Sequence, residues 1–339
     1  MVDQALSSLV HAFHALIWPA LIFGGLSLII KGRECLRSLK RCSAETGVNL
    51  TLLAIDAVLV LPVLAFITTG IAGAADRFGL IASIDWAAFG PLPAALAAVL
   101  LGDLIGYWRH RLEHSRVLWP AHAVHHSDTA MTWLTLMRFH PINRLTTAVI
   151  DSTVLLALGF PVWAVVVNNM IRHWYGFLIH ADLPWTFGLF GRIFVSPAMH
   201  RWHHVSDEAL AGKNFATVFV FWDVAFGTHY LPGVCRAPLG VHSGKRNAFS
   251  QLAHPFRTWF AALARRPSAS TVRTDCRASA IAPSRRAAMR ALVSARQRRT
   301  SLLPAGSASD AGPQASLTAA SMRRSNIRTS ASRLRSRSP

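Results

Sequence analysis

Charged side chains are scarce in this sequence, at 15% of 339 residues, whereas an ordinary soluble domain carries about 25%. Hydrophobic residues make up 52% of the chain, and this balance indicates a membrane protein. Acidic residues are especially few, but the resulting positive charge is local, because residues 257–339 hold 17 arginines and only two acids. The formal net charge of +19 is therefore poor support for a nucleic-acid-binding fold, and we expect no nucleic-acid partner.

Cysteine is equally rare, with four residues in the whole chain: Cys35, Cys42, Cys235 and Cys276. A disulfide framework has a higher density and a recognisable pairing, so disulfides are not expected to hold this fold together. Cys35 and Cys42 also lack the C-x-x-C spacing of a redox or zinc pair. A Gly-rich dinucleotide fingerprint and a haem motif are missing too, so redox chemistry would need electrons from a separate protein.

The chain has few charged residues but several long apolar segments. A bilayer core about 30 Å thick is crossed by roughly 20 apolar residues in a helix. Three segments reach that length: residues 12–30, 50–73 and 84–108. A fourth apolar block, residues 145–179, is interrupted by Gly159 and Pro161. Its length suits two short passes, or a hairpin that enters the membrane and returns, with the bend at this interruption.

Basic residues indicate the orientation of the first apolar segment. It lacks a preceding basic stretch and is longer than the core of a typical signal peptide, so we expect it to remain in the protein. Five basic residues follow it: Lys31, Arg33, Arg37, Lys40 and Arg41. By the positive-inside rule this stretch is cytoplasmic, which puts His110 at the cytoplasmic surface after two further crossings. The sequence thus predicts an all-α integral membrane helical bundle with four to five crossings and a cytoplasmic, His-rich helical cap.

Composition divides the chain into three parts. Residues 1–49 are predicted to form an N-terminal transmembrane helix and a basic cytoplasmic loop, and residues 50–256 the catalytic domain. Residues 257–339 are rich in Arg, Ser and Ala and lack a sustained apolar period. Such a segment buries too little apolar surface to offset its conformational entropy, so it is predicted to be a disordered tail.

Histidine is the unusual residue of this sequence, since 11 of its 16 histidines fall between positions 110 and 204. Most of these lie in three clusters: His110 and His114; His122, His125 and His126; and His200, His203 and His204. On a helix, positions i, i+3 and i+4 share a face, so each cluster is expected to point two or three imidazoles in one direction. Neutral imidazole is a good ligand for iron, zinc or copper. With His180 added, the region offers more nitrogen ligands than one metal ion takes, which predicts two ions.

Histidines outside the clusters carry less information. His140 and His173 lie within the same region, and each could be a ligand, a hydrogen-bond partner of a ligand or a packed side chain. The isolated histidines are expected to be ordinary surface or core residues; they are His11, His14, His229, His242 and His254.

Two other functions stay open at this point. The residues from His110 to His114 also match H-x-x-E-H, a zinc-hydrolase pattern in which Glu113 would act as general base. A membrane zinc metallohydrolase needs a further ligand, for which the only downstream glutamate is Glu208, and it leaves both H-x-x-H-H clusters without a role. The other alternative is a non-enzymatic metal-handling membrane protein, although transporters usually place ionisable ligands within the membrane helices.

Several motifs, taken in order, resemble those of one known family. They are residues 103–114 (DLIGYWRHRLEH), 122–128 (HAVHHSD), 138–141 (RFHP), 180–182 (HAD), 200–204 (HRWHH) and 214–230 (NFATVFVFWDVAFGTHY). The chain resembles the fatty acid hydroxylase superfamily, also called the sterol desaturase family, over residues 50–232. It departs from the pattern at Asp128, where a small polar residue such as serine is more usual, and in its Arg-rich tail.

The resemblance implies a multi-pass integral membrane di-iron oxygenase with its active site on the cytoplasmic side. Such an enzyme uses O2 and two electrons, drawn from NAD(P)H through a separate electron-transfer protein or reductase. It hydroxylates or desaturates an alkyl C–H bond of a lipid, fatty acyl or sterol-like substrate from the bilayer, and hydroxylation is slightly favoured here. The metal ligands that the match implies are His110, His114, His122, His125, His126, His180, His200, His203 and His204.

Three carboxylates are candidates for the hydrogen bonds that fix the tautomers of ligating imidazoles. Asp103 precedes His110 by seven residues, about two helical turns, and so shares its face. Glu113 and Asp223 are further candidates. Residues 214–230 look like the segment that closes the cap in the family, although aromatic packing against the membrane surface explains them equally well.

Overall fold

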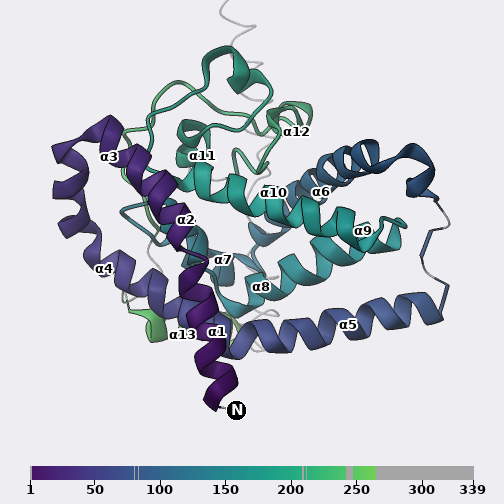
Figure 1. Cartoon of the computed structure of the whole chain (residues 1–339). Helices are drawn as coiled ribbons and strands as arrows, with labels where there is room; N and C mark the ends of the chain where they lie inside the picture. Colours follow the sequence, from purple (N-terminus) through teal and green to yellow (C-terminus); the bar gives the residue numbers. More distant parts are fainter. Residues whose placement is uncertain are drawn as a thin grey trace, which may run out of the picture. The chain divides into compact units, whose positions relative to one another are not determined.

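The computed structural model describes residues 2–79, 81–82, 84–207, 210, 212–241 and 247–264. In these residues the secondary structure is helical apart from two isolated β-bridges, between Phe194 and Phe219 and between Val205 and Leu239. The predicted all-α class is therefore confirmed. Figure 1 shows the helices along the chain.

Among the described residues, three helical stretches are long and apolar enough to cross a membrane, judged by length and composition. The first, Asp3–Lys31, contains α1 (Val2–His14), α2 (Ile17–Pro19), the π-helical turn η1 (Ala20–Gly24) and α3 (Gly25–Lys31). The second, Arg33–Arg77, contains α4 (Arg33–Ile55), the π-helical turn η2 (Asp56–Val60) and α5 (Leu61–Arg77). The third is α6 (Pro91–Glu113). These stretches overlap all three predicted apolar segments.

Two boundaries of these segments differ from the sequence prediction. The basic residues after Lys31 do not form a loop, because Gly32 adopts a φ of 54° and turns the chain within one residue, so that α4 starts at Arg33. The third segment was expected to start at residue 84. Instead a short 3₁₀ turn, η3 (Trp86–Phe89), comes first, and α6 starts at Pro91 after Gly90, whose φ is 84°.

The fourth apolar block forms a bent pair of helices, as its interruption predicts. Its first arm consists of α8 (Pro141–Thr147), the π-helical turn η5 (Ala148–Ser152) and α9 (Thr153–Ala157), and its second arm is α10 (Val162–His180). At the bend, Gly159 has a φ of 79°, and a Cβ atom there would lie 2.5 Å from the carbonyl oxygen of Ala82. Only glycine fits this turn without strain.

Helices α6 and α10 lie side by side, which brings their histidine-bearing ends together (Figure 1). Two glycines of α6 make the close approach possible. A Cβ at Gly102 would lie 2.2 Å from Oδ1 of Asn168, and one at Gly106 would lie 1.7 Å from Nη2 of Arg172. The polar side chains of α10 therefore occupy the space that side chains on α6 would otherwise fill.

The remaining helices are mostly short and surround the histidine-bearing ends. They are α7 (Trp119–His126), the 3₁₀ turns η4 (Trp133–Met137) and η6 (Gly188–Arg192), α11 (Pro197–His203), α12 (Val220–Ala225) and α13 (Ala248–Ala264). A buried cluster joins α6, α10, α11 and α12 through Tyr107, Ile179, Met199 and Val220. Helix α13 packs on α7 and α4.

Helix α13 extends into the predicted tail. Residues 257–264, which the composition assigns to that tail, are helical because they continue α13. The predicted disorder of residues 265–339 lies outside the described residues and stays a prediction.

Candidate metal centre

The nine histidines implied as ligands come together in two groups. The five-histidine group contains His110 and His114 from the end of α6, His122 and His126 from α7, and His203 from α11. The four-histidine group contains His125 from α7, His180 from the end of α10, and His200 and His204 from α11 and the residue after it. Within each group, one nitrogen of every histidine lies within 4.8 Å of the corresponding nitrogen of the others.

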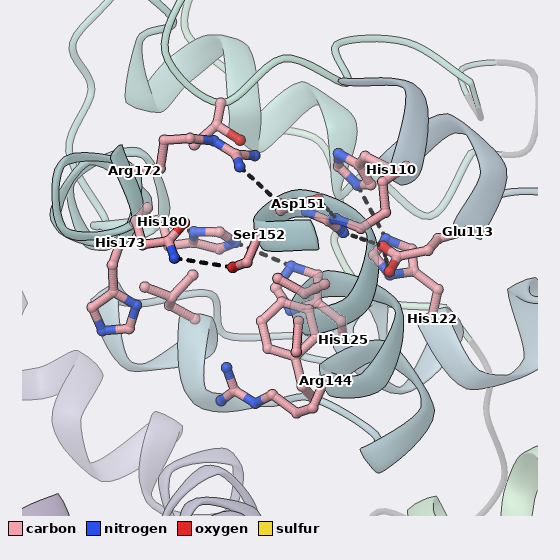
Figure 2. Close-up of a pocket in the computed structure, with 18 of the residues that line it drawn as sticks. His110, Glu113, His122, His125, Arg144, Asp151, Ser152, Arg172, His173 and His180 are labelled. Atoms are coloured by element: carbon pink, nitrogen blue, oxygen red, sulfur yellow. Dashed lines mark hydrogen bonds and ion pairs between the residues drawn. The ribbon is translucent and has the colours of Figure 1, made fainter. Parts of the chain in front are cut away.

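The Nε2 atoms converge in both groups. In the five-histidine group, Nε2 of His110 lies 3.1 Å from that of His122 and 3.0 Å from that of His203. In the four-histidine group, Nε2 of His180 lies 3.1 Å from that of His125 and 3.0 Å from that of His200. Figure 2 shows the first of these pairs with a dashed line. Two lone pairs that face each other this closely need a proton or a cation between them.

Backbone carbonyls fix the tautomers of four of these histidines. Nδ1 of His110 donates to the carbonyl oxygen of Phe215 at 2.9 Å, and Nδ1 of His203 to that of Lys213 at 2.6 Å. Nδ1 of His180 donates to the carbonyl oxygen of Gly176 at 2.7 Å. The fourth bond, from His125 to Arg138, is longer, at 3.3 Å. Because a carbonyl only accepts, Nδ1 carries the hydrogen and the Nε2 lone pair points into the group.

Burial keeps these imidazoles neutral. Desolvation lowers the pKa of His203 to about 4 and holds the pKa values of the histidines of α7 well below their usual value. Neutral imidazoles with inward Nε2 lone pairs are the donors that iron, zinc and copper bind. In addition, Nε2 of His114 is buried without a hydrogen-bond partner among the described residues. The residues present therefore fit two transition-metal ions.

Each H-x-x-H-H cluster is divided between the two groups, because two of its histidines join one group, in line with the expectation of two or three imidazoles in one direction, and the third joins the other. On α7, His122 and His126 join the five-histidine group while His125 joins the other. On α11 the assignment is reversed, because His203 joins the five-histidine group and its two neighbours in the cluster join the other. The groups are adjacent, since the rings of His126 and His204 stack with centroids 4.4 Å apart.

Glu113 contacts a histidine, as expected, but its oxygens are already engaged. Oε2 lies 3.3 Å from Nδ1 of His122 and accepts a hydrogen bond from Arg109 at 2.8 Å. Oε1 accepts from the hydroxyl of Thr146 at 2.5 Å. A carboxylate held in this way orients a ligand and is poorly placed to act as a general base. Glu208, the further ligand that a hydrolase would need, lies outside the described residues.

Asp103 and Asp223 act on the histidines through the backbone rather than by direct contact. Asp103 accepts hydrogen bonds from the backbone N–H groups of residues 217–219 at 2.9 to 3.2 Å. Asp223 accepts from the N–H groups of Phe215 and Ala216 at 2.8 and 3.0 Å. Together they hold the segment whose Phe215 carbonyl orients His110.

The histidines outside the clusters belong to neither group. Nδ1 of His140 accepts from the N–H of Ile142 and caps α8. His173 packs against Phe177 and lines the cavity described below. His11, His14, His229 and His254 are also outside both groups, and His242 lies outside the described residues.

Sequence reasoning missed a buried polar network behind His125. The side chain of Arg138 is fully buried and donates to Glu45 at 2.6 Å, while its backbone carbonyl accepts from His125. Asp128, the departure from the family pattern, accepts from Thr135 at 2.7 Å and from Asn49 at 3.1 Å. Asp128 therefore ties the loop after α7 to α4.

Other missed residues are charged side chains inside apolar runs. Asp151 in η5 pairs with Arg109 and Arg172, and Asp56 in η2 pairs with Arg144. Both carboxylates lie in π-helical turns, which are frequent at functional sites. A charge within a membrane-length apolar run was the signal that could have identified them.

A cavity of about 450 Å³ adjoins both histidine groups (Figure 2), which is within the usual range for a small-molecule site. Five of the nine histidines line it: His110, His122, His125, His180 and His200. Apolar side chains on its walls include Leu61, Leu64, Leu136, Phe139 and Ile179, and three arginines are Arg109, Arg144 and Arg172. The cavity can therefore hold a molecule that is mainly apolar and carries a polar group.

A family of known proteins matches the part of the chain that carries the nine histidines. The sequence model of the family named Fatty acid hydroxylase matches residues 95–228, which include all nine histidines. The chain is 32% identical over 165 residues to the ornithine lipid hydroxylase OlsE of Rhizobium tropici. The matched residues are 47% of this chain and 50% of that protein. The chain is also 32% identical over 128 residues to the alkylglycerol monooxygenase of Danio rerio, covering 37% of this chain and 28% of that protein.

A third relative is the methylsterol monooxygenase 2-2 of Arabidopsis thaliana, 26% identical over 143 residues, which cover 38% of this chain and 49% of that protein. The chain thus spans half or less of the length of these relatives. No solved structure matches it. The family match and the relatives agree with the motifs and the two histidine groups, so the chain is similar to the fatty acid hydroxylase family over residues 95–228.

Proposed function

We propose that this protein is an integral membrane di-iron oxygenase that hydroxylates an alkyl C–H bond of a lipid. The observation that carries the proposal is the position of both histidine groups on one largely apolar cavity. The reaction consumes O2, two electrons and two protons, and it yields a hydroxylated lipid and water. The three relatives described above are a lipid hydroxylase and two monooxygenases, which favours hydroxylation over desaturation.

The five-histidine and four-histidine groups would each hold one iron ion. When bound, the irons supply the O2-dependent attack on an unactivated C–H bond, a reaction for which amino-acid side chains have no oxidant. The chain's own residues hold the imidazoles in place, through the carbonyl oxygens of residues 213 and 215 on one side and through Gly176 and Arg138 on the other. Glu113 adds a carboxylate next to His122.

The apolar walls of the cavity position the substrate and exclude water. Leu61 and Leu64 come from the second membrane-length stretch, and Ile179 comes from α10. An alkyl chain packed against these residues would place its C–H bonds beside the histidines that line the same space. A dry pocket also limits side reactions of the activated oxygen with water.

For the membrane we propose four or five crossings, with the histidine groups on the cytoplasmic side. Three membrane-length stretches and the bent pair of α9 and α10 support this number. The basic residues that follow Lys31 support the cytoplasmic orientation. We further propose that the electrons come from NAD(P)H through a separate donor protein.

Metal analysis with Mössbauer spectroscopy tests the proposal on detergent-purified full-length protein from cells grown with iron-57. We expect about two irons per chain in a magnetically coupled site. A lipidomic comparison of cells with and without the protein would then identify the hydroxylated product. One zinc ion and no iron would contradict the proposal and favour the hydrolase or the metal-handling alternative.

A further inference from the structure

The cavity beside the two histidine groups carries three arginines, and they are not equivalent. Asp151 accepts a hydrogen bond from Nε of Arg109 and from Nη1 of Arg172, each at 2.7 Å. Arg109 also donates to Glu113 at 2.8 Å. The charges of these two arginines are therefore balanced within the cavity wall. The third arginine, Arg144, is held differently.

Arg144 uses only one of its nitrogen atoms for an ion pair. Its Nε donates to Oδ2 of Asp56 at 2.5 Å. Within the described part of the chain, its Nη1 and Nη2 atoms make no hydrogen bond. The side chain of Arg144 is 19% exposed, whereas that of Asp56 is 3% exposed. The two terminal nitrogens thus keep unused donors at the surface of the cavity.

A short stack of groups connects Arg144 to the four-histidine group. The guanidinium carbon lies 4.8 Å from the ring centroid of Phe139, and this ring stacks on His125 with centroids 4.6 Å apart and 2° between the planes. All three residues line the same cavity, and Figure 2 labels two of them, Arg144 and His125. A lipid with its polar group bound at Arg144 could therefore pass over Phe139 and place an alkyl carbon beside His125.

We infer that Arg144 is a specificity-determining residue, and that its Nη1 and Nη2 atoms bind an acceptor oxygen at the polar end of the lipid, a carboxylate or an acyl carbonyl. Asp56 is a positioning residue that holds the guanidinium through Nε. The planar fork of arginine matches a carboxylate through two parallel hydrogen bonds, which an alcohol cannot form. The inference rests on the proposed function only in treating the bound lipid as the substrate.

Binding of two matched lipids without turnover tests this inference. The full-length protein is placed in nanodiscs of zwitterionic lipid with no electron donor present. Energy transfer from tryptophan to a conjugated-tetraene fatty acid reports binding, and the alcohol with the same chain is the matched ligand. Protein-free nanodiscs give the partition background for each lipid.

We expect the wild-type protein to bind the acid about tenfold or more tightly than the alcohol, the usual effect of a hydrogen bond to a charged group. Arg144→Gln should remove this preference. Because this change leaves Asp56 without its partner, the Asp56→Asn/Arg144→Gln double variant provides a neutral pair and should bind acid and alcohol equally. Asp56→Asn alone should keep the preference or increase it.

Two results would overturn the inference. One is equal affinity of the wild-type protein for the acid and the alcohol. The other is an undiminished acid preference in a folded Asp56→Asn/Arg144→Gln protein, with folding checked by thermal unfolding. Arg192→Gln is the matched control, because Arg192 is an exposed arginine of η6 that does not line the cavity, and it should retain the preference.

The lipid-binding test and the metal analysis test separate claims, so each claim can be contradicted without the other. A protein without iron that still prefers the acid through Arg144 would contradict the di-iron function and leave the binding role of Arg144 intact. A protein with two irons and no acid preference would contradict only the role of Arg144.

Discussion

The carbonyl oxygen of Phe215 accepts a hydrogen bond from Nδ1 of His110 at 2.9 Å, and thereby fixes the direction of the Nε2 lone pair. That carbonyl is held in place from two sides. Asp223 accepts hydrogen bonds from the backbone N–H groups of Phe215 and Ala216, and Asp103 accepts from those of residues 217–219. The position of one ligand in the five-histidine group thus depends on two carboxylates that touch no imidazole of that group.

The first prediction concerns Asp103. Asp103→Ala leaves the N–H groups of residues 217–219 without their acceptor, so His110 should lose its orientation and metal affinity should fall by about 10–100-fold. Elemental analysis after exposure to chelators of increasing strength measures this loss. Asp103→Asn keeps one acceptor oxygen and should give an intermediate result. Wild-type metal retention in the alanine variant would contradict the assigned role.

The second prediction separates ligands from neighbouring histidines. His125→Ala and His203→Ala each remove a member of a different group, and each should abolish activity and metal retention together. His140→Ala should retain both metal ions and lose the cap of α8 together with the hydrogen bond from Nε2 to the carbonyl oxygen of Leu252, at a cost of about 1–3 kcal/mol. Iron content, hydroxylation of cell lipids and thermal unfolding are measured on the same preparations. Activity in either of the first two variants would refute the di-iron assignment.

The third prediction tests the ion pair behind His125. Because Arg138 is fully buried, Glu45→Gln leaves a buried positive charge without its closest partner and should destabilise the protein by roughly 3–5 kcal/mol. Adding Arg138→Met removes that charge and should recover part of the loss. Denaturant unfolding in detergent measures both. A Glu45→Gln protein as stable as the wild type would show that the ion pair between Glu45 and Arg138 does not stabilise the fold.

The fourth prediction concerns the C-terminal residues. Deleting residues 265–339 removes most of the positive charge and none of the histidines of either group. Iron content and lipid hydroxylation should therefore equal those of the full chain. A truncated protein that loses iron while remaining folded would assign these residues a role in the metal site.

Local periodicity explains what could be predicted from the sequence. The histidine clusters are recognisable because helical spacing places residues three and four apart near one another, and the apolar runs are recognisable by length. The bend at Gly159 follows from a glycine two residues before a proline. Each of these inferences uses residues that are close in the sequence, where geometry depends little on the rest of the fold.

Tertiary packing explains what could not be predicted. Spacing alone does not divide His125 from His126, because the division depends on how α11 approaches α7. The same limit applies to Asp103, whose acceptor role depends on a segment more than 100 residues away. Glu45 and Arg138 are 93 residues apart, and the RFHP motif that contains Arg138 does not indicate Glu45 as its partner. Tertiary packing determines which of these distant residues come into contact, and a single sequence does not show it.

Helices α7 and α11 each supply histidines to both groups, and this determines when during synthesis the groups can form. His110 and His203 lie next to each other although 93 residues separate them in the chain. Neither group is complete until α11 has left the ribosome and has packed against α7, because α11 supplies ligands to both. A metal ion would therefore bind to either group only after nearly the whole domain has been made, and a nascent chain that stops before residue 200 has neither group complete.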